Sequence, residues 1–140
     1  MFPHLAEVLP GLYIRMGHPD GTAVPSNWAR LEVRDGPIPD GPPDTLHLPV
    51  PDDAIWSDGY IEQVVEFIRS RLRRGQPVVV GCVAGVSRSP SAALAYMVDE
   101  YGLSVEEGLE RLREAYPRAN PSPVILDSLR EYFAARRDGA

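Results

Sequence analysis

One segment constrains the fold more than any other: an apolar, β-branched run that leads through a glycine-containing loop into a helix. The run Val78–Val80 is apolar at every position, which is typical of a strand buried on both faces. The loop follows over residues 81–90, and a helix is predicted over Ser91–Tyr101, with Pro90 in the first turn, where proline is tolerated. A strand that feeds a helix in this way indicates an α/β fold with helices on a sheet.

The rest of the chain repeats these two kinds of element. Helical spacing of apolar residues from Ile61 to Leu72 predicts a helix that Gly75 ends. Ser104 and Glu107 have the spacing of a capping box, which predicts a helix start there. A last helix is expected at about 123–136, and short strands at 11–14, 29–34 and 45–48. Residues 17–44 are rich in proline and glycine and otherwise predict no regular structure.

Composition excludes several classes of function. The chain has 140 residues, which predicts one domain over 1–140, and a net charge of −6 argues against a general nucleic-acid or anionic-membrane binder. Every basic residue is arginine, so chemistry that depends on lysine is excluded. Cys82 is the one cysteine, which excludes an internal disulfide and a multi-cysteine metal site. The start of the chain lacks a signal-peptide pattern, so a cytoplasmic location is expected.

The loop combines Cys82 with Arg88 and Ser89. Backbone N–H groups at a helix N-terminus form an anion site, and the helix dipole favours negative charge there. Arg88 adds a planar fork that can bind two phosphate oxygens. The same positive field favours a thiolate, so Cys82 is predicted to be a nucleophile at the floor of an oxyanion cradle. Gly85 permits a backbone conformation that other residues resist, and Ser89 can donate a hydrogen bond to the sulfur.

The loop also has a purely structural interpretation, and it lacks the residues that two other loop motifs require. A lone cysteine between an apolar strand and a helix is often a small buried hydrophobe. A phosphate-binding Walker loop requires a second glycine followed by lysine, but Val86 stands five residues after Gly81. A nucleophile elbow requires a final glycine where this chain has Ser89.

The segment VVVGCVAGVSRSPSAALAYMVDEY, residues 78–101, resembles the phosphate-binding loop and following helix of the dual specificity branch of cysteine-dependent protein phosphatases. Residues 11–14 resemble the opening strand of that family, and residues 48–53 resemble its general-acid loop. Residues 104–109 and Asn120-Pro121 are similar to its C-terminal helical half. The resemblance follows the chain in order from residue 45 onward. It implies a mixed, mostly parallel sheet of about four to five strands flanked by helices.

The resemblance also implies roles for individual residues. Cys82 is expected to be the nucleophile, Arg88 the phosphate clamp and Ser89 the hydroxyl directed at the thiolate. Asp52 is expected to be the general acid and then the base, with the adjacent Asp53 as the alternative, because spacing alone decides between them. The backbone cradle is expected to come from Val83, Ala84, Gly85, Val86, Ser87 and Arg88.

The resemblance further implies the reaction and its partners. The expected reaction is metal-free and cofactor-free hydrolysis of phosphomonoesters in phosphoproteins through a cysteinyl-phosphate, by a monomer that binds neither nucleic acid nor membrane. The uncharged loop interior favours phosphotyrosine, with or without phosphoserine and phosphothreonine.

Two departures limit the resemblance. The family usually has histidine before the nucleophile, whereas this chain has Gly81. Lower activity or a shifted pH optimum is therefore expected, and a histidine restored there is expected to favour the thiolate. The alternative is a weak or inactive phosphate-binding pseudophosphatase. Residues 17–44 match poorly, so the rim that selects substrate is the least defined part of the site.

Overall fold

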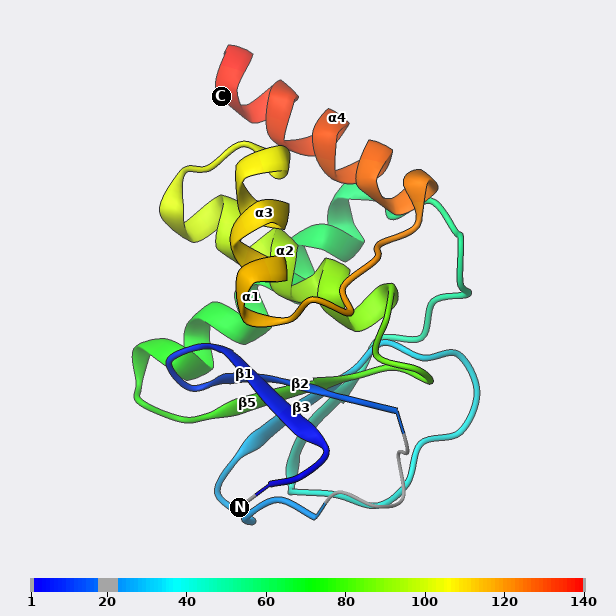
Figure 1. The fold of residues 1–140 in the computed structure, drawn as a ribbon, viewed down its shortest axis with the longest axis vertical. Helices are drawn as coiled ribbons and strands as arrows, with labels where there is room; N and C mark the ends of the chain where they lie inside the picture. The colour runs from blue at the N-terminus through cyan, green and yellow to red at the C-terminus, as the bar shows by residue number, and fades with distance from the viewer. Residues whose placement is uncertain (1, 18–22, 140) are drawn as a thin grey trace.

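The computed structural model describes residues 2–17 and 23–139. It contains a five-stranded sheet with helices packed on it (Figure 1). The strands are β1 (Leu5–Leu9), β2 (Leu12–Arg15), β3 (Ala29–Glu32), β4 (Asp44–His47) and β5 (Val78–Gly81), and the helices are α1 (Asp58–Arg73), α2 (Arg88–Tyr101), α3 (Val105–Ala115) and α4 (Pro123–Gly139).

The strand order in the sheet is β1-β2-β5-β3-β4. Strand β1 pairs with β2 antiparallel, whereas β2–β5, β5–β3 and β3–β4 are parallel pairs. The expected mixed, mostly parallel sheet flanked by helices is thus confirmed. Because the parallel strands run in one direction, the segments that follow β2, β3, β4 and β5 leave the sheet at the same edge, where α/β folds place their ligand sites.

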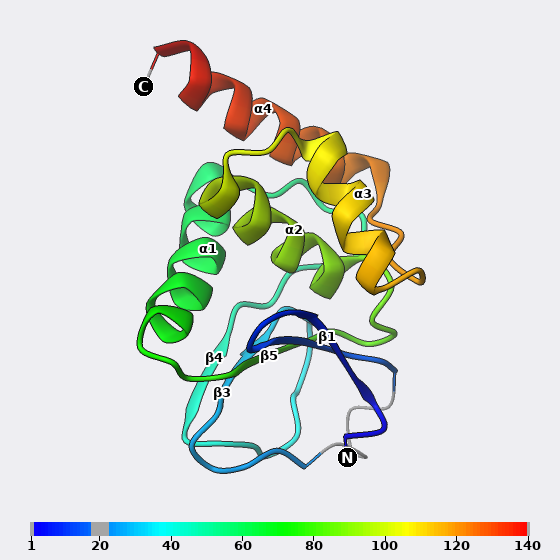
Figure 2. The same ribbon diagram turned by 60° about the vertical axis from the view of Figure 1, so that its left-hand side comes forward.

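The two faces of the sheet are covered differently. In both views the helices lie on one face, and connecting segments lie on the other (Figures 1 and 2). Leu31, Val78 and Val80 point to the helix face and belong to the main core with Leu94 of α2, all four fully buried. The alternate residue Val79 points to the opposite face. It packs there in a smaller cluster with Leu5 and Trp28.

Most of the predicted elements are present, with small shifts of their ends. The capping box of α3 is formed by Ser104 and Glu107, and Gly102 ends α2 in the left-handed conformation. Helix α2 begins at Arg88, three residues earlier than predicted, so Arg88 lies inside the first turn. Strand β1 was not predicted.

None of the helices in the described part of the chain is long and apolar enough to cross a bilayer. Within the proline- and glycine-rich region 17–44, residues 18–22 lie outside the described residues. The expected substrate rim is therefore described at residue 17 and from residue 23 onward.

Candidate active site

The loop between β5 and α2 encloses a single buried thiol. Cys82 directly follows β5, and its side chain is 2% exposed. Three groups approach the sulfur: the Gly85 N–H donates to Sγ at 3.3 Å, the Ser89 N–H donates at 3.4 Å, and the Ser89 Oγ lies 3.2 Å from Sγ. Donors that converge on sulfur stabilise its negatively charged form. The predicted neighbours Cys82, Gly85 and Ser89 are therefore brought together.

The start of α2 differs from the starts of α1 and α3. Ser57 and Ser104 cap α1 and α3 by accepting hydrogen bonds from backbone N–H groups, whereas Ser87 makes no such bond at α2. The first N–H groups of a helix have no partner within the helix and carry the positive end of its dipole. At α2 the Cys82 sulfur accepts one of them, from Ser89. The loop therefore presents a positive helix end to the thiol.

Hydrogen bonds from the C-terminal half of the chain hold the loop in shape. Gly85 has a φ of +72°, which favours glycine. The Tyr116 hydroxyl donates to the Gly85 carbonyl at 2.6 Å, and the Asn120 N–H donates to the Val86 carbonyl at 2.7 Å. The Ser87 Oγ accepts from the Ser122 N–H at 2.9 Å. Val83 and Ala84 lie exposed at the outer rim of the loop.

Arg88 is buried and already holds a carboxylate. Its Nη1 donates to Asp35 Oδ1 at 2.7 Å and to the Val50 carbonyl at 2.8 Å. The hydrogen bond from Arg88 holds the pKa of the Asp35 carboxyl below its ordinary value, so Asp35 is ionised at neutral pH. Asp35 is an unpredicted member of the site. It lies 53 residues from Arg88 in the sequence, beyond any local pattern.

The expected acid residues lie on the neighbouring loop after β4. Asp52 and Asp53 are exposed and line a hollow of about 530 Å³ together with Ser87 and Asn120. The Asp52 carboxylate accepts a hydrogen bond from the Asp53 N–H at 3.2 Å, and Asp53 has a φ of +59°. Because Ser87 belongs to the loop between β5 and α2, this hollow adjoins the loop that contains Cys82. The structure thus brings both carboxylates to the edge of the loop.

Two carbonyl groups of the loop over residues 48–53 accept hydrogen bonds that fix this loop next to the site. Arg88 holds the Val50 carbonyl, two residues before Asp52. The Tyr60 hydroxyl donates to the Leu48 carbonyl at 2.7 Å. Burial raises the pKa of Tyr60 above its ordinary value, so the hydroxyl stays protonated and remains a donor.

This arrangement can be compared with known proteins. Residues 43–135 match the family model described as the dual specificity phosphatase catalytic domain. The chain belongs to the dual specificity phosphatase family. The resemblance inferred from the loop motif is therefore confirmed, and the matched residues include 48–53, the loop over 81–90 and α1 to α4 up to residue 135.

Curated dual specificity phosphatases show the same relationship. The chain is 31% identical over 134 residues to mouse dual specificity protein phosphatase 15, with 91% of this chain and 57% of the mouse protein covered. It is 33% identical over 79 residues to human protein phosphatase Slingshot homolog 2, with 56% of this chain and 5% of that protein covered. The chain thus spans just over half of the mouse relative and a small part of the human one.

Solved structures of the family share the fold over nearly the whole chain. Human DUSP28 has a TM-score of 0.81 at 26% identity, with 98% of this chain and 97% of that chain covered. A mouse putative dual specificity phosphatase, solved in complex with zinc tungstate, has a TM-score of 0.81 at 25% identity, with 96% and 89% covered.

Within this dual specificity phosphatase fold, position 81 has no room for a side chain. A Cβ built on Gly81 would lie less than 3.0 Å from three atoms of the Arg15 guanidinium, closer than real Cβ contacts. That guanidinium is buried and pairs with Glu32, and it donates to the Cys82 carbonyl at 3.0 Å. The expectation that a histidine can be restored at position 81 therefore requires Arg15 to move. Arg15 and Glu32 were also not predicted as site residues, because strand register alone brings them to the loop.

Proposed function

We propose that the chain is a cysteine-dependent phosphomonoester hydrolase that dephosphorylates phosphoproteins through a cysteinyl-phosphate, with residues 1–140 as one catalytic domain. The observation that carries this proposal is the surrounding of the Cys82 sulfur. Two backbone N–H groups and the Ser89 hydroxyl lie 3.2–3.4 Å from Sγ at the start of α2. A sulfur so placed is suited to attack the phosphorus of a phosphate group that the same loop holds.

In the first step the Cys82 thiolate attacks phosphorus, and the bond from phosphorus to the substrate oxygen breaks. The loop N–H groups and the Arg88 fork stabilise the equatorial oxygens, on which charge is spread in the transition state. Asp52 donates a proton to the leaving oxygen, so the product leaves as an alcohol or phenol. Sulfur is then bonded to phosphorus, and Asp52 is ionised.

In the second step water attacks phosphorus while Asp52 accepts its proton. The sulfur–phosphorus bond breaks, which returns the thiolate and releases inorganic phosphate. The Ser89 hydroxyl supports this step, because a hydrogen bond to sulfur stabilises the thiolate as it leaves. The two steps together return Cys82 and Asp52 to their starting states.

Asp35 holds Arg88 until a phosphate arrives. Its side chain is 57% exposed, whereas the Arg88 side chain is 8% exposed. A phosphate dianion carries more charge than one carboxylate, and it can accept from two N–H groups of the fork, whereas Asp35 accepts from Nη1. It is therefore the stronger partner for Arg88, and Asp35 remains solvated when the guanidinium turns toward phosphate.

The proposed substrates are phosphotyrosine with or without phosphoserine and phosphothreonine. The residues between Cys82 and Arg88 carry no charge, which suits a simple phosphomonoester. The relative solved with tungstate, a tetrahedral oxyanion, supports an oxyanion site in this fold. The proposed enzyme is a monomer that works without metal or cofactor. Its proposed location is a reducing compartment such as the cytoplasm, because a thiol nucleophile must stay reduced.

A second candidate is a phosphate-binding protein with little or no turnover. The engagement of Arg88 by Asp35 favours it, because a fork that stays bound to Asp35 cannot clamp a transition state. Slow turnover together with tight phosphopeptide binding would support this candidate over the first.

The phosphoenzyme is the intermediate that separates these candidates. We expect rapid acid quenching during turnover of p-nitrophenyl phosphate, followed by mass spectrometry, to find phosphate on the peptide that contains Cys82. An Asp52→Asn variant, in which the second step lacks its base, is expected to accumulate more of it. Phosphate on a different residue, or none on either protein while turnover proceeds, would contradict the mechanism.

Replacing Ser89 by alanine is expected to slow the second step more than the first. A hydrogen bond to a charged group contributes about 1.5–3 kcal/mol, which corresponds to roughly a ten- to hundredfold lower rate of thiolate release. Stopped-flow kinetics should then show a burst of p-nitrophenol that wild type lacks. Ser91→Ala is the matched control, since the Ser91 hydroxyl donates to the Ser87 carbonyl at 2.6 Å instead of to sulfur. Equal kinetics for Ser89→Ala and Ser91→Ala would remove Ser89 from the mechanism.

A further inference from the structure

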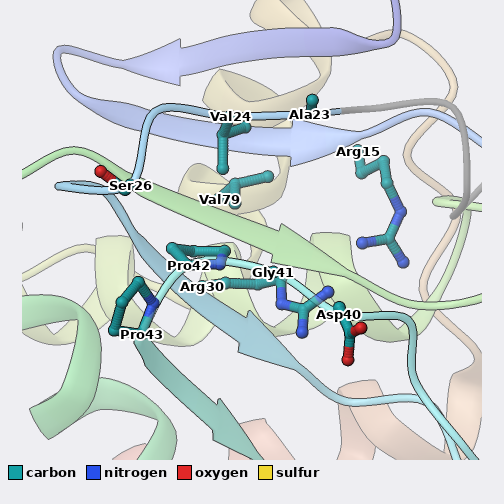
Figure 3. Close-up of a pocket in the computed structure, with 10 residues that line it drawn as sticks. All are labelled: Arg15, Ala23, Val24, Ser26, Arg30, Asp40, Gly41, Pro42, Pro43 and Val79. Atoms are coloured by element: carbon teal, nitrogen blue, oxygen red, sulfur yellow. The ribbon is translucent and has the colours of Figure 1, made fainter.

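We infer that Arg15 is a positioning residue for the nucleophile loop, residues 81–90. It pairs with Glu32 across the strand position of Gly81, fixes the loop in place and puts a positive charge next to it. The inference rests on the proposed function of that loop. It concerns the face of the sheet opposite the helices, where Arg15 and Arg30 line a cavity of about 210 Å³ (Figure 3).

Strand register places the three residues side by side. On β2 and β5, Ile14 is opposite Val80, so the next residues are Arg15 and Gly81. On β3 and β5, Glu32 is opposite Gly81. Because residues in register point to the same face, Arg15 and Glu32 flank a strand position that has no side chain. The Arg15 side chain can therefore reach across β5 to Glu32.

Three hydrogen bonds hold the Arg15 guanidinium at that position. Both Arg15 Nη atoms donate to the Glu32 carboxylate, Nη1 to Oε2 and Nη2 to Oε1, the latter at 3.0 Å. Arg15 Nη2 also donates to the Cys82 carbonyl at 3.0 Å. Arg15 is 3% exposed and Glu32 is fully buried. A planar fork with three hydrogen bonds cannot move aside cheaply, and it connects the Cys82 backbone to β2 and β3.

The arrangement requires glycine at position 81. A Cβ there would overlap the guanidinium. Although an arginine end group is flexible on a surface, this one is buried and holds a buried carboxylate. Moving it would leave Glu32 without its main partner. Gly81 and Arg15 therefore depend on each other.

Arg15, Arg30 and Glu32 are buried charged residues that lie together beneath the loop. Arg30 Nη1 lies 3.9 Å from the same Glu32 carboxylate, so two guanidinium groups share one buried anion. Burial lowers the pKa of Arg30, and the charged groups that act on it are Glu32, Arg15, Asp40 and Arg34. The two buried arginines and the one buried glutamate leave an excess of one positive charge, in a chain whose net charge is −6. The Arg15 guanidinium, hydrogen-bonded to the Cys82 carbonyl, favours the negatively charged thiolate form of the same residue.

Removing the pair as a unit tests the inference. We expect Arg15→Met combined with Glu32→Gln to slow iodoacetate alkylation of Cys82 about tenfold at pH 7, the size of one charge-assisted hydrogen bond. The kcat/KM for p-nitrophenyl phosphate should fall by a similar factor. Arg15→Lys, which keeps the charge and loses the fork, should lie between this variant and wild type.

A pair elsewhere in the fold provides the matched control. Arg71 of α1 donates to both oxygens of Asp44 of β4, at 3.0 and 2.9 Å. Arg71→Met combined with Asp44→Asn should lower the melting temperature and leave alkylation unchanged. If the Arg15–Glu32 variant also lowers only the melting temperature, its role is purely structural and the inference is wrong.

Gly81→Ala provides a second test that leaves the charges in place. We expect it to displace Arg15 and to slow alkylation as much as removal of the pair. When Gly81→Ala is added to the Arg15→Met/Glu32→Gln variant, alkylation should slow no further. Wild-type alkylation in Gly81→Ala, or losses that multiply, would overturn the inference. Alkylation does not require turnover, so an inactive wild type would contradict the proposed function while leaving this comparison intact.

Discussion

Replacement of Arg88 by lysine is expected to lower kcat/KM for p-nitrophenyl phosphate by about 10³-fold, within the range for arginines that stabilise phosphoryl transfer. Lysine keeps the positive charge, but it cannot present two donors to two phosphate oxygens. It also loses the geometry that holds the Val50 carbonyl at 2.8 Å and so orients the acid loop. Both losses act on the transition state.

The control for this variant is Arg130→Lys. Arg130 also makes an ion pair, with Glu106 at 2.7 Å, but it lies on the exposed surface of α4. Its replacement should leave turnover within about twofold of wild type, as exposed pairs contribute little. Arg88→Lys activity within about tenfold of wild type would show that the fork is not part of the reaction.

Replacement of Asp52 by asparagine is expected to lower the rate by about 10²–10⁴-fold on alkyl phosphates, whose leaving oxygen needs a proton. The loss should be smaller on p-nitrophenyl phosphate, because its leaving oxygen is weakly basic. The dependence of rate on leaving-group basicity should therefore become steeper in Asp52→Asn. Initial rates on a series of phosphate esters measure it.

The matched control is Asp53→Asn, because both carboxylates line the same hollow. If Asp53→Asn shows the steeper dependence and Asp52→Asn does not, the acid is one residue further along the chain. If neither variant changes it, the proton comes from outside this loop and the second step loses its assigned base.

The nucleophile loop was predictable because its residues are close in sequence. Cys82, Gly85 and Ser89 lie within eight positions, and a strand followed by a helix fixes how such a loop folds. The helix pattern from Ile61 and the capping box at Ser104 were equally local and were confirmed. Short-range periodicity and capping chemistry carry this information.

The supporting residues were not predictable, because long-range register brings them to the loop. Arg15 is 67 residues from the Cys82 carbonyl that it contacts. A charged residue in a strand is ordinarily taken as solvent-facing, yet Glu32 is fully buried between two arginines. Strand β1 was missed because its buried residues, Leu5 and Val8, do not alternate, and a bulge between Glu7 and Leu9 interrupts its pairing.

We propose Cys82 as the nucleophile of a metal-independent phosphatase. Hydrolysis of p-nitrophenyl phosphate in EDTA across pH 5–8, by wild type and by Cys82→Ser, tests it most directly. We predict turnover by wild type and none by Cys82→Ser. Both proteins should bind tungstate, and Cys82→Ser should have the melting temperature of wild type. Turnover by Cys82→Ser, or a folded wild type that binds tungstate and releases no product, would contradict this proposal.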